Sequence, residues 1–433
     1  MDFTPTDEQA AARDLAARIF GDLSTHDRLA AAGTGTDSEV WKALCGAGLI
    51  AAVGEIGLLG LVLLLEEQGR TTAQVPLAVT CVYGMLAVGA HGTEEQRARL
   101  LPAIGDGSVV VTGAFPASGT VRADAPAPPP ASASTAGALS GTAGVVPWLR
   151  DATHVLVPDA DRGLWLVATA DAGVTVEAVD TTAPWSAGRL TLDAAPGERI
   201  GVLRSFPRPA PSRCDILRLR RVGGSAPDPG PQTPDGLDVA RGGLGAAPGG
   251  ASVAPDGLNV ARGGLGVAPD EADGGGAAYE EVLGVGRVAF AGVQAGVCAG
   301  AVARAVAHTS QREQFGRPLS ANQGVLLRAA DAYMDTEAIR VTAYEAAWRY
   351  DEGLPFATHA LTAAWWASDA GHRVVHAGQH LHGGTGADLD HPVHRHFLWG
   401  RQLDAYLGGA SQVLEELGQL LTGEKGDEEE TAV

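Results

Sequence analysis

The chain has 433 residues, which is more than one compact core normally holds and predicts two or three domains. Its apolar fraction of 45% is ordinary for a soluble globular protein, and its formal charge of −20 argues against a nucleic-acid partner. The four cysteines are widely spaced without a CxxC pair, so we expect free thiols in a reducing cytoplasm.

The first part of the chain, residues 1–107, is predicted to be helical. Thr4-Pro5-Thr6-Asp7 predicts a cap, a proline at the first helical position and an acid in the first turn. A second helix begins at Thr93, with Gln96 at capping-box spacing. The N-terminus lacks the basic and apolar regions of a signal peptide. The run "IGLLGLVLLL" has ten residues, whereas a membrane span needs about 20, so we interpret it as core.

Residues 108–204 change in character and predict a small β domain. Short β-branched segments such as "SVVVTGAF", "ATHVLVPD" and "GLWLVATA" are separated by proline, glycine and aspartate. A proline-rich stretch, "APAPPPASAS", is expected to be an extended loop.

Residues 205–277 are rich in glycine and proline. "PDGLDVARGGLG" recurs as "PDGLNVARGGLG" with a period of 21 residues. Two copies are too few for a solenoid, so we interpret the segment as a duplicated, disordered insertion, with a partner-binding segment as the alternative.

Helices are predicted again over 278–422, before an acidic tail at 423–433. Gly292, Gly296 and Gly300 follow one another at intervals of four, which lets a second helix approach closely. The predicted fold is therefore α+β, with a helical domain, a β domain and a helix-bundle domain.

Two segments of the last domain carry candidate binding chemistry. In "SQREQFGRPLSANQ", Arg312 offers planar donors for a phosphate and Phe315 an apolar face for a heterocycle; Arg312 could equally be a surface residue in a turn. In "QHLHGGTG", the glycines let backbone amides approach an anion. Histidines crowd this region too, but the segment has an explanation that needs no metal.

Together, and behind a helix–β–helix layout, these segments resemble the acyl-CoA dehydrogenase family. The family's Arg-x-Gln-Phe-Gly-x-Pro turn is similar to "REQFGRPL", and its Gln-x-x-Gly-Gly-x-Gly loop followed by Pro-Val-x-Arg is similar to "QHLHGGTG…PVHR". The resemblance covers nearly the whole chain outside 205–277 and the tail. It implies a FAD shared between subunits, an acyl-CoA substrate and an electron-transfer flavoprotein or similar acceptor. The residues that it implies at the FAD are Arg312, Gln314, Phe315, Gln379, Gly383 and Gly384.

The departures from the family concern catalysis. The usual glutamate base stands in a segment that reads "LGGASQ" here, so Gly408 occupies its position. A family subset places the base before an arginine that corresponds to Arg287, where this chain has Gly286. Glycine cannot accept a proton. The segments that meet the flavin ring are also reduced, to "GAFPASGT" and "VVPW".

We therefore hypothesise a base-lacking subunit that completes the FAD site of a base-bearing partner, as in heteromeric actinobacterial enzymes for bulky thioesters such as steroid side chains. A flavin-dependent oxygenase on the same fold and a non-enzymatic scaffold are the alternatives. Ser411 is expected to cap the final helix after the Gly408-Gly409 turn.

Overall fold

The computed structural model describes residues 3–124, 136–200 and 274–423. The repeats of the duplicated insertion, the proline-rich stretch and the acidic tail lie outside these ranges, so the expectations for them stay predictions.

The N-terminal part is helical, as predicted. Thr6 caps the first helix through a capping box with Gln9, so the helix begins at Asp7 and Pro5 lies before it rather than at its first position. The predicted capping box of Thr93 and Gln96 is confirmed. The elements are α1 (Asp7–Leu23), α2 (His26–Ala32), α3 (Ser38–Gly46), α4 (Leu49–Thr71), α5 (Leu77–Val79), the π-helix η1 (Thr80–Leu86), α6 (Ala87–His91) and α7 (Glu94–Gly105).

A seven-stranded sheet follows. Its strand order is β1-β4-β5-β7-β3-β2, with β6 also paired to β7, and only the β1–β4 pair is parallel. The strands are β1 (Val111–Gly113), β2 (Arg122–Asp124), β3 (Ala136–Val146), β4 (His154–Pro158), β5 (Leu164–Ala168), β6 (Val174–Ala178) and β7 (Gly188–Ile200). The sequence did not predict β3, because "AGALSGTAGVV" is rich in alanine and glycine; pairing with β7 along its length makes it a strand.

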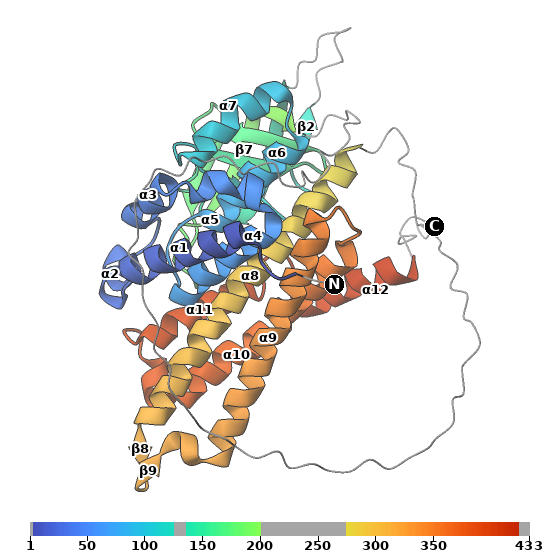
Figure 1. The fold of residues 1–433 in the computed structure, drawn as a ribbon. Coiled ribbons are helices and arrows are strands. Elements are labelled where there is room, and N and C mark those ends of the chain that lie inside the picture. Colours follow the sequence, from blue (N-terminus) through green and yellow to red (C-terminus); the bar gives the residue numbers. More distant parts are fainter. Residues whose placement is uncertain (1–2, 125–135, 201–273, 424–433) are drawn as a thin grey trace, which may run out of the picture. The chain divides into compact units, whose positions relative to one another are not determined.

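Long helices form the C-terminal part. Figure 1 shows α8, α9 and α10 running side by side, with a small hairpin at the end of α8. The elements are α8 (Gly274–Gln311), β8 (Glu313–Gln314), β9 (Arg317–Pro318), the 3-10 turn η2 (Leu319–Ala321), α9 (Gln323–Asp351), α10 (Ala357–Leu381), the 3-10 turn η3 (Gly383–Ala387), α11 (Pro392–Leu403) and α12 (Ala410–Thr422).

Helices α4 and α8 are long and apolar enough to cross a membrane by length and composition. The structure buries them instead: 72% of the apolar window of α4 and 94% of that of α8 lie inside the protein. The run "IGLLGLVLLL" is part of this core, with Leu58, Leu61 and Leu64 fully buried.

The glycine stripe of α8 lies directly against α4, which confirms the predicted close approach. A Cβ placed on Gly296 would lie 1.9 Å from the carbonyl oxygen of Glu66, and one on Gly69 would lie 2.1 Å from that of Val293. These contacts involve backbone atoms, which cannot rotate away. The two backbones can therefore pack at this distance only because both positions lack a side chain.

Replacing Gly296 by alanine should force α4 and α8 apart. We expect Gly296→Ala to lower the free energy of unfolding by about 3 kcal/mol, as overpacking of a core does, measured by chemical denaturation. Gly324→Ala is the matched control, because a Cβ there meets nothing within 4 Å; it should be neutral. Equal stability of the two variants would contradict the close packing.

A buried carboxylate supports the break in α4. Gly57 has φ 72° and ψ −170°, so the helix is interrupted there and starts again. Asp351 accepts hydrogen bonds from the N–H groups of Leu58 (2.7 Å) and Leu59 (2.9 Å), which satisfies the first turn of the restarted helix. Burial raises the pKa of Asp351 to about 6, although the two backbone hydrogen bonds oppose this shift.

This raised pKa makes a contribution to stability that depends on pH. The folded protein holds the Asp351 proton more tightly than the unfolded chain, whose aspartate has a pKa of about 3.9. The contribution is therefore complete below about pH 4 and is lost as the pH rises through about 6. Asp351→Asn keeps an acceptor oxygen but cannot titrate. The difference in unfolding free energy between this variant and the wild type should change by on the order of 2 kcal/mol across that range.

Candidate functional site

The two glycines that the resemblance assigns to the family's base positions, Gly286 and Gly408, lie close together in the structure, although they are 122 positions apart in the sequence. A Cβ placed on Gly286, in α8, would lie 3.3 Å from Cδ1 of Leu407 and 3.4 Å from the Tyr83 hydroxyl. Gly408 has φ +113°, a conformation that strains any other residue, and a Cβ there would lie 3.1 Å from Val413. The backbone itself thus disfavours a glutamate at position 408.

Arg287 lies beside these glycines and is only 6% exposed. Its Nη2 forms an ion pair of 2.7 Å with Glu416 of α12, and its Nε donates to the carbonyl oxygen of Leu407 at 3.3 Å. Glu416 is the acidic side chain that the structure brings to this place, and its charge is already paired. Glu280 and Glu281, one to two turns earlier in α8, bond instead to Arg162 and to the hydroxyl of Tyr350.

Aromatic rings close the same region. The ring of Phe115 stacks between Tyr83 and Tyr279, with centroid distances of 5.0 and 5.5 Å. The hydroxyls of Tyr83 and Tyr406 are 3.2 Å apart. Burial, reinforced by Tyr406, raises the pKa of Tyr83 well above its ordinary value, so it stays neutral. The cavity left beside Gly408 has about 20 Å³, room for about one water.

Arg312, Gln314 and Phe315 stand on the hairpin β8–β9 at the end of α8. Phe315 is 96% exposed and has φ +55°, which a non-glycine residue rarely adopts. The backbone N–H of Arg312 donates to the carbonyl oxygen of His308 at 2.8 Å and so ties the hairpin to the helix. The three predicted residues are therefore all exposed, away from the core of their own chain.

The glycine loop at Gly383 lies next to the end of α8. The ring of His308 stacks on that of His382, with centroids 4.7 Å apart, so the structure brings together the two segments that the sequence singled out. Gly383 has φ +63° and is exposed together with Gly384.

The role predicted for Gln379 needs correction. Three residues, not two, separate Gln379 from Gly383, so His380 stands at the spacing of the family's glutamine. The side chain of Gln379 donates to the carbonyl oxygen of Gly386 at 3.1 Å and closes its own loop. Nδ1 of His380 accepts instead from Arg328 of α9 at 2.7 Å. No short motif marks Arg328, because only the tertiary structure places α9 against α10.

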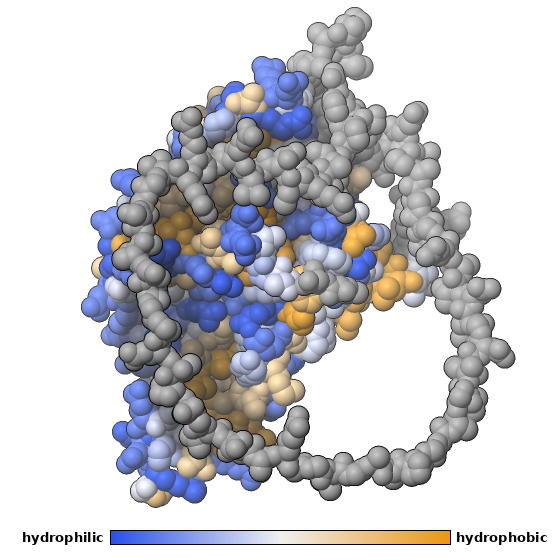
Figure 2. All heavy atoms as spheres, in the orientation of Figure 1, coloured by the Kyte–Doolittle hydropathy of each residue, from blue (hydrophilic) through white to orange (hydrophobic). Residues whose placement is uncertain are grey.

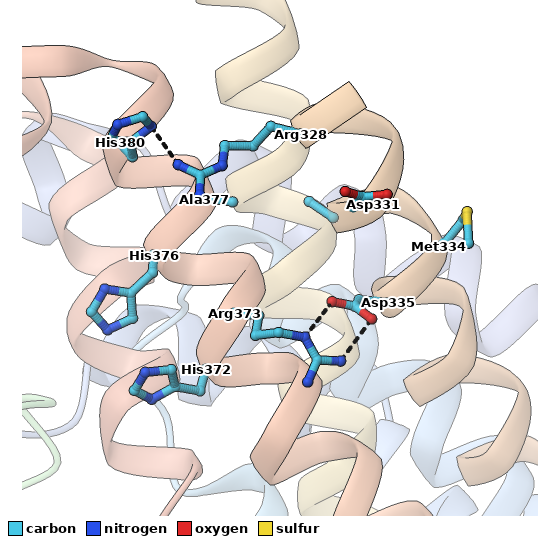
Figure 3. A pocket seen from close by; sticks show the side chains of 10 residues that line it. Arg328, Asp331, Met334, Asp335, His372, Arg373, His376, Ala377 and His380 are labelled. Atoms are coloured by element: carbon cyan, nitrogen blue, oxygen red, sulfur yellow. Dashed lines mark hydrogen bonds and ion pairs between the residues drawn. The ribbon is translucent and has the colours of Figure 1, made fainter. Parts of the chain in front are cut away.

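A groove of about 660 Å³ runs between α9 and α10 (Figure 3). Three histidines one turn apart, His372, His376 and His380, line its α10 side. Arg373 is neutralised by Asp335 at 2.8 Å. Arg328 instead contacts a histidine, and no ion pair to it is found among the residues that the structure describes. In the ranges that the structure covers, no group of three or more histidine, cysteine or acidic side chains could hold a metal ion.

The final helix begins two residues earlier than predicted. Gly409 is its N-cap and makes no side-chain cap, so Ser411 lies inside α12 and does not cap it. The exposed leucines of α12 are Leu414, Leu420 and Leu421. Figure 2 shows hydrophobic residues gathered at this helix.

Comparison with known proteins agrees with this geometry. Residues 6–108 match the family described as "Acyl-CoA dehydrogenase, N-terminal domain", and residues 273–419 match "Acyl-CoA dehydrogenase, C-terminal domain". The chain belongs to the acyl-CoA dehydrogenase family. The members of this family are oxidoreductases, and their cofactor is FAD.

Three acyl-CoA dehydrogenases are similar to this chain over most of its length. Acyl-CoA dehydrogenase FadE27 of Mycobacterium tuberculosis is 29% identical over 89% of this chain and 88% of its own. The Tcur3481-Tcur3483 steroid ACAD, solved as a variant, is 35% identical with a TM-score of 0.74, covering 96% of this chain and 98% of the other. The ChsE4-ChsE5 complex of Mycobacterium tuberculosis is 27% identical with a TM-score of 0.75, covering 98% and 100%.

Proposed function

We propose that this chain is the base-lacking subunit of a heteromeric, FAD-dependent acyl-CoA dehydrogenase, and that it completes the FAD site of a base-bearing partner. The observation that carries the proposal lies along α8. The empty base position Gly286 stands about a third of the way along α8, and the hairpin with Arg312 follows the C-terminal end of this helix at Gln311, 25 positions after Gly286. At a rise of about 1.5 Å per residue the two positions are roughly 37 Å apart.

This separation favours two different sites along α8. The region around Gly286 is packed with the chain's own aromatic rings and leaves little room for an acyl thioester. The C-terminal end presents an exposed arginine and an exposed aromatic ring. A neighbouring chain could use this second end while providing its own base.

The exposed end suits the parts of FAD that carry no redox chemistry. Arg312 and Arg328 can donate to phosphate oxygens, and the Gly383-Gly384 backbone allows an anion to come close. The ring of Phe315 can cover a heterocycle. Because an arginine can only donate, Nδ1 of His380 is the acceptor in its hydrogen bond with Arg328. The other ring nitrogen of His380, Nε2, therefore carries the hydrogen and can donate it.

When bound, FAD accepts the hydride that leaves the β-carbon of an acyl-CoA thioester. Proton abstraction from the α-carbon requires a carboxylate within hydrogen-bond reach, and we assign that group to the partner. Similarity to a steroid ACAD suggests a bulky CoA thioester as substrate. We place the complex in the cytoplasm and propose an electron-transfer flavoprotein or a similar protein as its acceptor.

Co-expression with a base-bearing acyl-CoA dehydrogenase chain tests the proposal. We expect little flavin absorbance from this chain alone, and a yellow, active complex when the two chains are purified together. A homo-oligomer of this chain that is fully loaded with flavin and active would overturn the proposal.

Within that complex, Arg312→Ala should weaken flavin binding by roughly 10- to 100-fold, because it removes a hydrogen bond to a charged phosphate. The loss of flavin affinity is measured from the fluorescence of the flavin that the complex releases on dilution. Arg150→Ala is the matched control, since Arg150 is an exposed arginine of the β domain with no assigned role, and should change nothing. If Arg312→Ala behaves like the control, this chain contributes contacts only and is a scaffold.

The variant Glu416→Gln tests whether α12 supplies a catalytic base. Because Glu416 is paired with Arg287, we expect kcat of the complex to stay within about twofold, with at most a lower melting temperature. Glu415→Gln, on the exposed side of the same helix, controls for the loss of charge. A loss of kcat by a factor of about 100 or more with flavin retained would assign the base to this chain instead.

A further inference from the structure

Three histidine rings meet where the glycine loop reaches the end of α8. The ring centroid of His382 lies 4.7 Å from that of His308 in a stacked pair and 5.0 Å from that of His391 in an edge contact. His382 is only 5% exposed, and the other two histidines are half-buried. Gly383 and Gly384 follow His382 directly, so the place of this ring sets where the loop begins.

The stacked ring pair joins this loop to α8. In the part of the chain that the structure describes, the hydrogen bonds of η3 stay within the loop or run to α10 and α11. The side chain of Gln379 donates to the carbonyl oxygen of Gly386, and the hydroxyl of Thr385 donates to that of His382. The stack of His308 on His382 therefore holds the loop beside the helix end that carries the β8–β9 hairpin.

The side chains that face these rings from the surrounding elements are mostly basic. Arg304 precedes His308 by four residues on α8, and no carboxylate partner of Arg304 is found among the residues that the structure describes. His391, at the start of α11, is influenced by His26 of α2 as well as by Arg304. Asp388 is the acid that acts on His391 in the opposite direction. A proton taken up by any of the rings thus meets more positive than negative charge.

The rings resist protonation for this reason and because they are buried. Burial lowers the pKa of His382, and the charges of His308, His391 and Arg304 lower it further. Nδ1 of His382 already donates to the carbonyl oxygen of Gly378 at 2.7 Å, so a further proton must enter at Nε2. An unfolded histidine has a pKa of about 6.5. The contribution of the neutral cluster to stability is therefore present above that pH and is lost as the pH falls below it.

We propose that His308 is a positioning residue of the proposed flavin site: its neutral ring holds His382 and the glycine loop beside the hairpin, and protonation of the three histidines in mild acid releases the loop and weakens flavin binding. The inference rests on the proposed function, since it assigns regulation to the same site. Positive charges on rings 4.7 Å apart and largely out of water repel each other strongly. A phosphate at the exposed glycines lies in water, which screens its attraction for those charges.

Flavin release from the co-purified complex, measured at about pH 7.5 and about pH 5.5, tests this regulation. We expect the wild type to lose roughly tenfold in flavin affinity between the two, the effect of one unit of pKa difference. His308→Ala should bind flavin more weakly than the wild type at the higher pH, because the ring contact is lost. His308→Phe keeps a ring that cannot be protonated, so it should regain affinity over the alanine variant and lose less of it in acid. His359→Gln, at the other end of α10, is the matched control and should keep the wild-type pH profile.

Hydrogen exchange of the loop amides, Gly383–Ala387, tests the release in this chain alone, without flavin. At about pH 5.5 they should exchange faster in the wild type than in His308→Phe, whereas at about pH 7.5 the two proteins should match. A complex that holds no flavin at any pH contradicts the proposed function, while the exchange still tests the ring stack.

Three results would overturn the inference. The first is equal exchange of the loop in wild type and His308→Phe in acid. The second is a pH profile of flavin release that His308→Phe leaves unchanged. The third is tighter flavin binding in acid, which would assign the histidines to direct attraction of the phosphates.

Discussion

The contact between α4 and α8 is the constraint on which the rest of the structure depends. Gly296 lies so close to the backbone of Glu66 that neither helix can shift toward the other or carry a side chain at the crossing. This contact fixes α8 along the core. Along α8 then lie the two places that the proposed function uses: Gly286, about a third of the way along the helix, and the Arg312 hairpin beyond its C-terminal end.

A polar contact secures α9 to the same pair of helices. Glu66, only 4% exposed, accepts hydrogen bonds from Arg340 at 2.7 Å and from the hydroxyl of Tyr344 at 2.7 Å. Arg70 of α4 also pairs with Glu66, at 3.1 Å, and a buried carboxylate is tolerated only with such partners. Arg340 lies on the flank of α9, so the outward face with Met334 is held toward solvent.

The surroundings of Gly286 and the C-terminal end of α8 differ in the way that a divided active site would require. Near Gly286, the aromatic stack and the ion pair of Arg287 with Glu416 fill the space. At the hairpin, Phe315 keeps a positive φ, a conformation that costs free energy, and its ring stays exposed, so packing within the described part of the chain does not offset that cost. A binding partner that covers this ring would account for both features.

Much of the fold could be predicted from the sequence, because it depends on local patterns. Local patterns such as the Thr93 capping residue, the β-branched strand segments and the glycine spacing of α8 can be recognised within a few consecutive residues. The sequence likewise shows directly which residues stand at positions 286, 408, 312 and 315. Strand β3 could not, because its alanines and glycines become a strand only by pairing with β7.

The sequence by itself thus determined which side chains are present: two glycines at the positions that the resemblance assigns to a base, and an arginine and a phenylalanine in the turn that it assigns to the cofactor. Only the tertiary structure decided which of these meet. It places Gly286 against Leu407, and His308 against His382. It also directs Gln379 into its own loop while His380 meets Arg328. The physical reason is that these contacts join residues on different helices, and helix packing rather than sequence spacing sets their distances.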